Sequence, residues 1–273
     1  MTALTLGAMA RIYRRFWQVN WAEQWQYRAN LLMYLLYWIV SPVVYLSIWS
    51  AVARAQGNVQ GLTANDFVTY YLALLVVDVL TSDITIHILA YKIQDGTLSG
   101  DLIRPVHPIL TGTMVNNLAF KALTLVVLVP VWLVLVLLIR PDFSAVTWQS
   151  VLLTLPAVAL GYGISFFLGA TLTCVAFWTT RVYAVNEMFY SLGVLFSGQF
   201  VPLELMPRAI QQAAQFLPFQ LTRYFPVQLV LNRLPPEATW RNYALAVVWL
   251  VVCAGLFLLV WRAGVKRFSA VGA

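Results

Sequence analysis

The sequence has 273 residues, of which 61% are hydrophobic and 10% are charged, with a formal net charge of +7. A water-soluble domain carries about 25% charged residues, so this composition excludes a soluble globular protein and requires one that lies in lipid. The basic residues are scattered singly, with no dense basic patch, which argues against binding to nucleic acid.

An aromatic stripe precedes the first long apolar run. Tyr13, Trp17, Trp21 and Trp25 recur at every fourth position. This spacing predicts an amphipathic helix within residues 1–30 that lies in the membrane interface, with its indole rings at headgroup depth. The stripe could instead pack against neighbouring protein. In both interpretations the segment is a lateral anchor.

Six segments are apolar enough to be membrane spans, for which about 20 residues are needed. They are, roughly, residues 31–53, 67–90, 113–139, 148–178, 184–200 and 242–262. Six spans put both termini on one side, and Lys and Arg are enriched on the cytoplasmic side. We therefore predict an all-α membrane protein with six transmembrane helices, both termini cytoplasmic, and a single transmembrane domain over residues 1–273.

The orientation rests on a count of basic residues. With a cytoplasmic N-terminus, six of the 17 Lys and Arg residues are outside: Arg54, Arg140, Arg208, Arg223, Arg233 and Arg241. The other eleven are inside: Arg11, Arg14, Arg15, Arg28, Lys92, Arg104, Lys121, Arg181, Arg262, Lys266 and Arg267.

Ionisable residues within predicted spans are costly and often functional, and four of them are candidates here. Asp78 lies in the middle of the second span, Asp83 and His87 follow it, and Glu187 is near the start of the fifth. In a continuous helix, Asp83 and His87 would share one face, one turn apart. These residues could line a hydrated path, or they could cap and pack helix ends. Two ligands are too few for a metal site, so none is predicted.

Small residues recur at every fourth position of the fourth predicted span: Gly161, Ser165, Gly169 and Thr173. Such a stripe lets another helix approach closely, either within the subunit or across a dimer. Between the fifth and sixth spans, prolines at 202, 207, 218 and 226 divide the chain into pieces too short to cross the membrane. We expect residues 198–230 to form re-entrant or interfacial helices on the outer face.

The connector between the second and third predicted spans, residues 91–110, reads YKIQDGTLSGDLIRPVHPIL. Glycines and prolines punctuate it, and each proline disfavours helix in the residue before it. We expect a compact, rigid cytoplasmic protrusion that exposes Leu98, Leu102 and Ile103. A floppy linker would need neither the prolines nor these apolar residues, so the connector is predicted to dock onto a partner.

Motifs of common enzymes are missing from the sequence. It has no G-x-S-x-G, no H-E-x-x-H and no G-x-x-x-x-G-K-[ST] phosphate loop. We therefore expect that this chain is not an enzyme, does not hydrolyse ATP and holds no cofactor.

In these features, the chain resembles a permease subunit of the type-2 ATP-binding-cassette (ABC) exporters over essentially its whole length. The resemblance rests on the amphipathic N-terminal helix, the six spans, and the pattern G-x-L-x-x-x-L-I-R-P-V-x-P from Gly96 to Pro108. A second pattern, S-G-x-x-x-P-x-x-x-x-P, runs from Ser197 to Pro207.

The resemblance implies a dimer of six-span permeases, identical or related, with two separate ATPase subunits that bind ATP and Mg. The connector would be the coupling helix that docks on the ATPase, beside the N-terminal helix. The residues expected to carry coupling are Asp95, Gly96, Leu98, Asp101, Leu102, Arg104 and Pro105.

The expected function is export of an amphiphilic or hydrophobic substrate, of the drug, lipid or glycan type, across the cytoplasmic membrane. A proton-coupled secondary transporter that uses Asp78, Asp83 and His87 is the alternative, although its halves would be expected to resemble each other and they do not convincingly do so. A membrane scaffold or an intramembrane enzyme is the third hypothesis.

Overall fold

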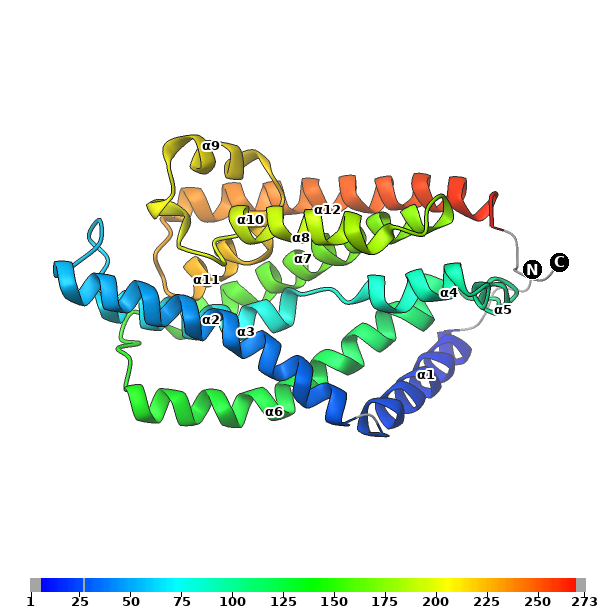
Figure 1. Cartoon of the computed structure of the whole chain (residues 1–273), viewed down its shortest axis with the longest axis horizontal. Helices are drawn as coiled ribbons and strands as arrows, with labels where there is room; N and C mark the ends of the chain where they lie inside the picture. Colours follow the sequence, from blue (N-terminus) through cyan, green and yellow to red (C-terminus); the bar gives the residue numbers. More distant parts are fainter. Residues whose placement is uncertain (1–5, 27, 269–273) are drawn as a thin grey trace.

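Figure 1 shows a computed structural model of the chain as an elongated assembly of helices. The structure describes residues 6–26 and 28–268, so residues 1–5 and 27 of the predicted interfacial segment lie outside the described residues. Within the described ranges the fold is all-α, and the β-structure there is an isolated bridge between Val59 and Leu62.

The described helices follow one another along the chain with mostly short connections. They are α1 (Leu6–Gln26), α2 (Arg28–Gln56), α3 (Ala64–Thr81), the π-helical η1 (Ile86–Ala90), α4 (Tyr91–Gln94), α5 (Leu98–Leu102), the π-helical η2 (Ile109–Met114), α6 (Val115–Ile139), α7 (Trp148–Thr173), η3 (Cys174–Phe177), α8 (Val182–Phe196), η4 (Leu203–Leu205), α9 (Arg208–Phe216), α10 (Phe219–Thr222), α11 (Tyr224–Val230) and α12 (Pro236–Val265).

Five helical segments within the described residues are long and apolar enough to cross a membrane. They are Trp38–Gln56, Ala64–Gln94, Gly112–Ile139, Trp148–Phe177 and Pro236–Val265. The predicted span 184–200 corresponds to α8, which has 15 residues. At 1.5 Å per residue α8 is about 22 Å long, shorter than the ~30 Å hydrocarbon core.

Helices α7 and α12 run parallel to each other. Their contacts advance in step, from Leu153 with Tyr243, through Gly163 with Leu250, to Phe177 with Gly264. Because both helices run in one direction, the residues between them must bring the chain back to the starting end. Helix α8 begins this return, and α9, α10 and α11 complete it (Figure 1).

Helix α1 packs beside the start of α6. The Asn116 side-chain amide donates to Asn20 Oδ1 at 2.7 Å, and Trp21 packs against Phe120 and Leu123. The aromatic stripe is therefore divided. Trp21 packs against protein, whereas the rings of Trp17 and Trp25 remain exposed. Figure 1 places α1 at the same end of the molecule as α5 and the end of α12.

The second span is interrupted, which a continuous apolar run does not predict. Helix α3 stops at Thr81, residues 82–84 are not helical, and the chain resumes as η1 and α4. The prediction that Asp83 and His87 share a helix face is therefore wrong, because Asp83 lies in the interruption. The connector then begins directly after the π-helical segment η1 and ends within the π-helical segment η2.

The segment after α8 is held by aromatic side chains of α2 and α3. The Tyr70 hydroxyl donates to the carbonyl of Gly198 at 2.8 Å, and the Tyr71 hydroxyl donates to that of Phe200 at 2.7 Å. The Trp49 indole also donates to Phe200. These bonds satisfy backbone carbonyls that have no helical partner, as a membrane interior requires.

The small-residue stripe of α7 faces two different neighbours. A Cβ on Gly161 would meet backbone atoms of Leu221 and Thr222 at 3.1–3.2 Å, so α10 lies directly against α7 there. Two turns further on, a Cβ on Gly169 would overlap the Asp83 carboxylate. The close approach that small residues allow is therefore used within the chain, by α10 and by the interruption of the second span.

Replacing Gly198 tests this packing. Its φ is +76°, and a Cβ would lie 2.6 Å from the Tyr70 hydroxyl, so Gly198→Ala combines backbone strain with a clash. We expect a loss of about 1–3 kcal/mol of stability, measured as a lower midpoint of thermal unfolding in detergent. Gly255→Ala is the control, because it adds a Cβ to α12 with no atom within 4 Å. Equal midpoints for the two variants would contradict this account.

Candidate functional site

A cavity of about 1080 Å³ opens between helices of the half of the molecule that carries the connector. Segments from α1, α2, η1, α6, α7, α8 and α10 contribute to its wall. Its polar lining is formed by Glu23, Gln24, Ser82, Asp83, His87, Asn116, Ser165, Asn186, Glu187, Tyr190, Thr222 and Arg223. The cavity thus brings together three of the four ionisable residues singled out in the sequence, namely Asp83, His87 and Glu187.

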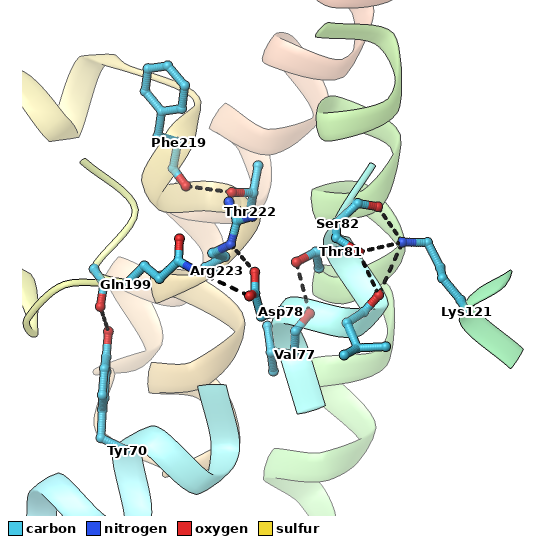
Figure 2. Close-up of polar contacts among 12 residues, drawn as sticks. Tyr70, Val77, Asp78, Thr81, Ser82, Lys121, Gln199, Phe219, Thr222 and Arg223 are labelled. Carbon is cyan, nitrogen blue, oxygen red and sulfur yellow. Dashed lines mark hydrogen bonds and ion pairs between the residues drawn. The ribbon is translucent and has the colours of Figure 1, made fainter. Parts of the chain in front are cut away.

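The fourth residue, Asp78, forms a buried ion pair at the edge of this cavity. Its carboxylate is bound by the Arg223 guanidinium through Nε, and Gln199 Nε2 lies 3.4 Å from its other oxygen (Figure 2). The two charged side chains are only 3% and 12% exposed. Arg223 lies where α10 meets α11, so the pair ties the segment of short helices α9–α11 to the second span.

Lys121 of α6 reaches into the interruption of the second span. Its ammonium donates to the Val79 carbonyl and the Ser82 hydroxyl, each at 3.1 Å, and to the Ser82 carbonyl (Figure 2). It also lies 4.7 Å from the centre of the Tyr162 ring, within the range of a cation–π contact. A helix end leaves carbonyls without partners, and Lys121 supplies donors to them.

Asp83 is fixed by short polar contacts on the other side of the interruption. Its Oδ1 accepts from the Asn117 amide at 2.6 Å and from the Thr85 hydroxyl at 2.5 Å. Asn117 and Lys121 are one turn apart on α6, so one face of α6 serves both sides of the break. His87 lies instead against Tyr183, with ring centres 6.3 Å apart. The described contacts of Asp78, Asp83 and His87 therefore diverge and do not form one relay.

Leu98 is buried and anchors the connector to the rest of the protein. Leu98 is fully buried, in a cluster that includes Ile93 and Trp261. The prediction that Leu98 is exposed is wrong, because the left-handed turn at Gly96 (φ +76°) directs α5 back onto the helices. Leu102 is partly buried, whereas Ile103 is 87% exposed.

Asp101 holds the connector in shape. Its carboxylate accepts from Lys92 Nζ at 2.7 Å and pairs with Arg104 at 3.0 Å. Gly112 of η2 lies against this pair, since a Cβ there would be 3.0 Å from the Lys92 nitrogen. Asp101 therefore joins the end of the second span, the connector and the start of the third.

Two neighbours support the connector from outside. The Arg104 guanidinium lies over the Phe16 ring of α1, 5.7 Å from its centre. The His107 ring packs 5.1 Å from that of Trp261 in α12, and its burial lowers the pKa of His107 below the ordinary value of 6.5. Asp95 and Pro105 are exposed. The α1 helix and the end of α12 thus both contact the connector.

Lys121, Asn117 and Arg223 were not singled out as site residues from the sequence. Lys121 was counted among the cytoplasmic basic residues, but it is buried within the long helical segment Gly112–Ile139. A lysine within so apolar a segment indicates that its ammonium group has a buried hydrogen-bonding partner. Arg223 gave no comparable signal, because its role depends on how the outer segment folds back onto α3.

Metal ligands do not gather in the described part of the chain, where no group of three His, Cys, Asp or Glu residues could hold an ion. Cys174 and Cys253 are both buried free thiols.

The chain is similar to a known family of proteins. The model of a family described as ABC-2 family transporter protein matches residues 39–272, from within α2 to beyond α12. No curated protein matches the chain significantly.

Breaking the Asp78–Arg223 pair should be costly, because the remaining charge would be buried alone. We expect Asp78→Asn and Arg223→Gln each to destabilise the chain by about 3–5 kcal/mol, and the double variant to recover much of that loss. Thermal unfolding in detergent measures the effect. Arg104→Gln is the control, because it removes an arginine that is 52% exposed from its pair and should cost about 0–1 kcal/mol. Single variants as stable as the wild type would show that the pair contributes little.

Proposed function

Because the chain belongs to the ABC-2 family of transporter proteins, we propose that it is the permease subunit of an exporter driven by ATP. It is a multi-pass membrane protein with several apolar helices. Its sequence has no phosphate loop, so ATP and Mg would bind to a separate ATPase subunit. Two such ATPases would serve two permeases, the second identical or related to this chain.

The connector is the part that we assign to the ATPase, and its geometry is the observation that carries the proposal. Asp101 bonds to Lys92 and Arg104, which makes the protrusion rigid, and Leu98 anchors it in the core. Ile103 extends from this fixed base with 87% of its surface exposed. A large apolar side chain on a rigid, polar protrusion is suited to filling a pocket of a partner.

Coupling would follow from what the connector touches. The exposed residues Asp95, Arg104 and Pro105 would contact the ATPase beside Ile103, whereas Gly96, Leu98 and Leu102 would maintain the shape. Both α1 and α12 contact the connector. A movement of the ATPase would therefore be transmitted to the connector, to α1 and to α12 together.

Six passages through the membrane, with both termini cytoplasmic, fit the parallel course of α7 and α12. One passage must separate two parallel helices, and α8 with the residues that follow it would make it. The outer segment 198–230 would then be re-entrant, and the whole chain would be one transmembrane domain in the cytoplasmic membrane. The exposed indoles of Trp17 and Trp25 support an interfacial position for α1.

The cavity would be the path of the substrate. It reaches from α1 to Arg223, where the ion pair with Asp78 would close the outer end. Apolar residues such as Met33 and Leu168 share its wall with polar ones, which suits an amphiphilic substrate of the drug, lipid or glycan type. Asp83, His87 and Glu187 would face this substrate.

Ile103→Asp tests the docking assignment. A P-loop ATPase, to be sought first in the neighbouring reading frames, is co-expressed, and its affinity for the permease is measured after purification. A charge at the centre of an apolar contact should weaken binding by about 1.4–2.8 kcal/mol, or roughly 10- to 100-fold. Phe216→Asp is the matched control, because Phe216 is 78% exposed at the end of α9, away from the connector.

Full assembly of the Ile103→Asp variant with the ATPase would show that the connector does not dock there. Reduced assembly of both variants would indicate misfolding, which unfolding measurements would reveal as a lowered midpoint for both.

A further inference from the structure

Charge is distributed unevenly around the cavity. Its wall carries three acidic side chains, Glu23, Asp83 and Glu187, one arginine, Arg223, and one imidazole, that of His87. The chain as a whole has the opposite sign, with a net charge of +7. The average composition of the protein does not explain an acidic cavity. Each charge on the cavity wall therefore has to be balanced by a specific partner.

Two of these four charges are compensated by protein. Arg223 is paired with Asp78. Asp83 accepts hydrogen bonds from Asn117 and Thr85, and the Lys121 ammonium is bound to the adjacent residue, Ser82. The wall is therefore left with the charges of Glu23 and Glu187, which form no ion pair with any side chain that the structure describes. His87, on the same wall, is a titratable group that interacts electrostatically with Glu187.

Glu187 is the more informative of the two acidic residues. It lies in the apolar helix α8, at an exposed position on the cavity wall. The Ser191 hydroxyl, one turn further on, donates to the Glu187 backbone carbonyl and leaves the carboxylate free of that bond. An unpaired carboxylate within membrane helices is expensive, and a cationic ligand would offset that cost.

Aromatic rings lie close to Glu187 along the chain and on the same wall. Phe189 and Tyr190 belong to α8, and Phe219 of α10 packs against Phe189 with ring centres 5.0 Å apart. Ring faces attract organic cations and also bind apolar groups. A carboxylate and aromatic rings that line one cavity form a favourable environment for an organic cation and an unfavourable one for phosphate. The volume of about 1080 Å³ is sufficient for a drug-sized molecule.

We propose that this cavity binds amphiphilic organic cations, with Glu187 as the counter-ion and the rings of Phe189, Tyr190 and Phe219 as the apolar wall. The inference rests on the proposed transport function and narrows its substrate class. It excludes anionic head groups, such as those of phospholipids and charged glycans, which the unpaired carboxylates would repel.

Two hydrophobic ions of similar size and opposite charge test the proposal. Tetraphenylphosphonium and tetraphenylborate are titrated into the purified chain in phosphatidylcholine nanodiscs, with empty nanodiscs as the reference for partitioning into lipid. The cation should bind saturably and the anion should not. Glu187→Gln should weaken binding of the cation by about tenfold, and Glu187→Asp should restore most of it.

Glu237→Gln is the matched control, because it removes one carboxylate from an exposed position in the first turn of α12, outside the cavity wall. It should bind the cation like the wild type. The proposal is overturned if the wild type does not bind the cation saturably, if the anion binds equally well, or if Glu187→Gln leaves binding unchanged.

This assay contains no ATPase, so it separates the two proposals. If the cation does not bind but the ATPase docks normally, the proposed substrate class is wrong and the proposed exporter function is unaffected. Cation binding without any docking of the ATPase would reject the exporter instead.

Discussion

The structure depends on satisfying the polar groups that a broken helix exposes in a membrane. The second span stops at Thr81 and resumes at Thr85, and no water in the hydrocarbon core could bind the freed backbone. Lys121 and Asn117 from α6 supply donors on either side of the break, and Gly169 of α7 leaves space for Asp83. Three helices are thus fixed around one interruption, and the cavity wall begins at the same residues.

The same requirement determines how the outer segment is attached. Its residues are divided by prolines into short helices, which leave carbonyls such as those of Gly198 and Phe200 without helical partners. Tyr70, Tyr71 and Trp49 donate to them, while Arg223 brings a charge that Asp78 neutralises. The segment is therefore held against α2 and α3 by hydrogen bonds and an ion pair.

Much of the fold could be predicted from the sequence, because long apolar runs have few other solutions than helices across a membrane. The division of residues 198–230 into short helices followed from its prolines. The break at 82–84 was not predicted, because the polar residues Ser82 and Asp83 are too few to divide an apolar run of the length expected for one span. Of the candidate site, Asp83, His87 and Glu187 could be found as costly charges in spans. Arg223 could not, because its partner is 145 positions away, and the burial of Leu98 depended on a turn that composition does not reveal.

The two π-helical segments have a geometric consequence for the connector. A π-turn accommodates one residue more than an α-turn, so it displaces every following side chain by about 100° around the helix axis. Segment η1 lies between the break at 82–84 and α4, so it sets the direction in which the side chains of Tyr91–Gln94 point at the start of the connector. Segment η2 includes the last two residues of the connector, Ile109 and Leu110, and leads into α6. A helical wheel drawn backwards from α6 therefore assigns these two residues to the wrong side of the helix.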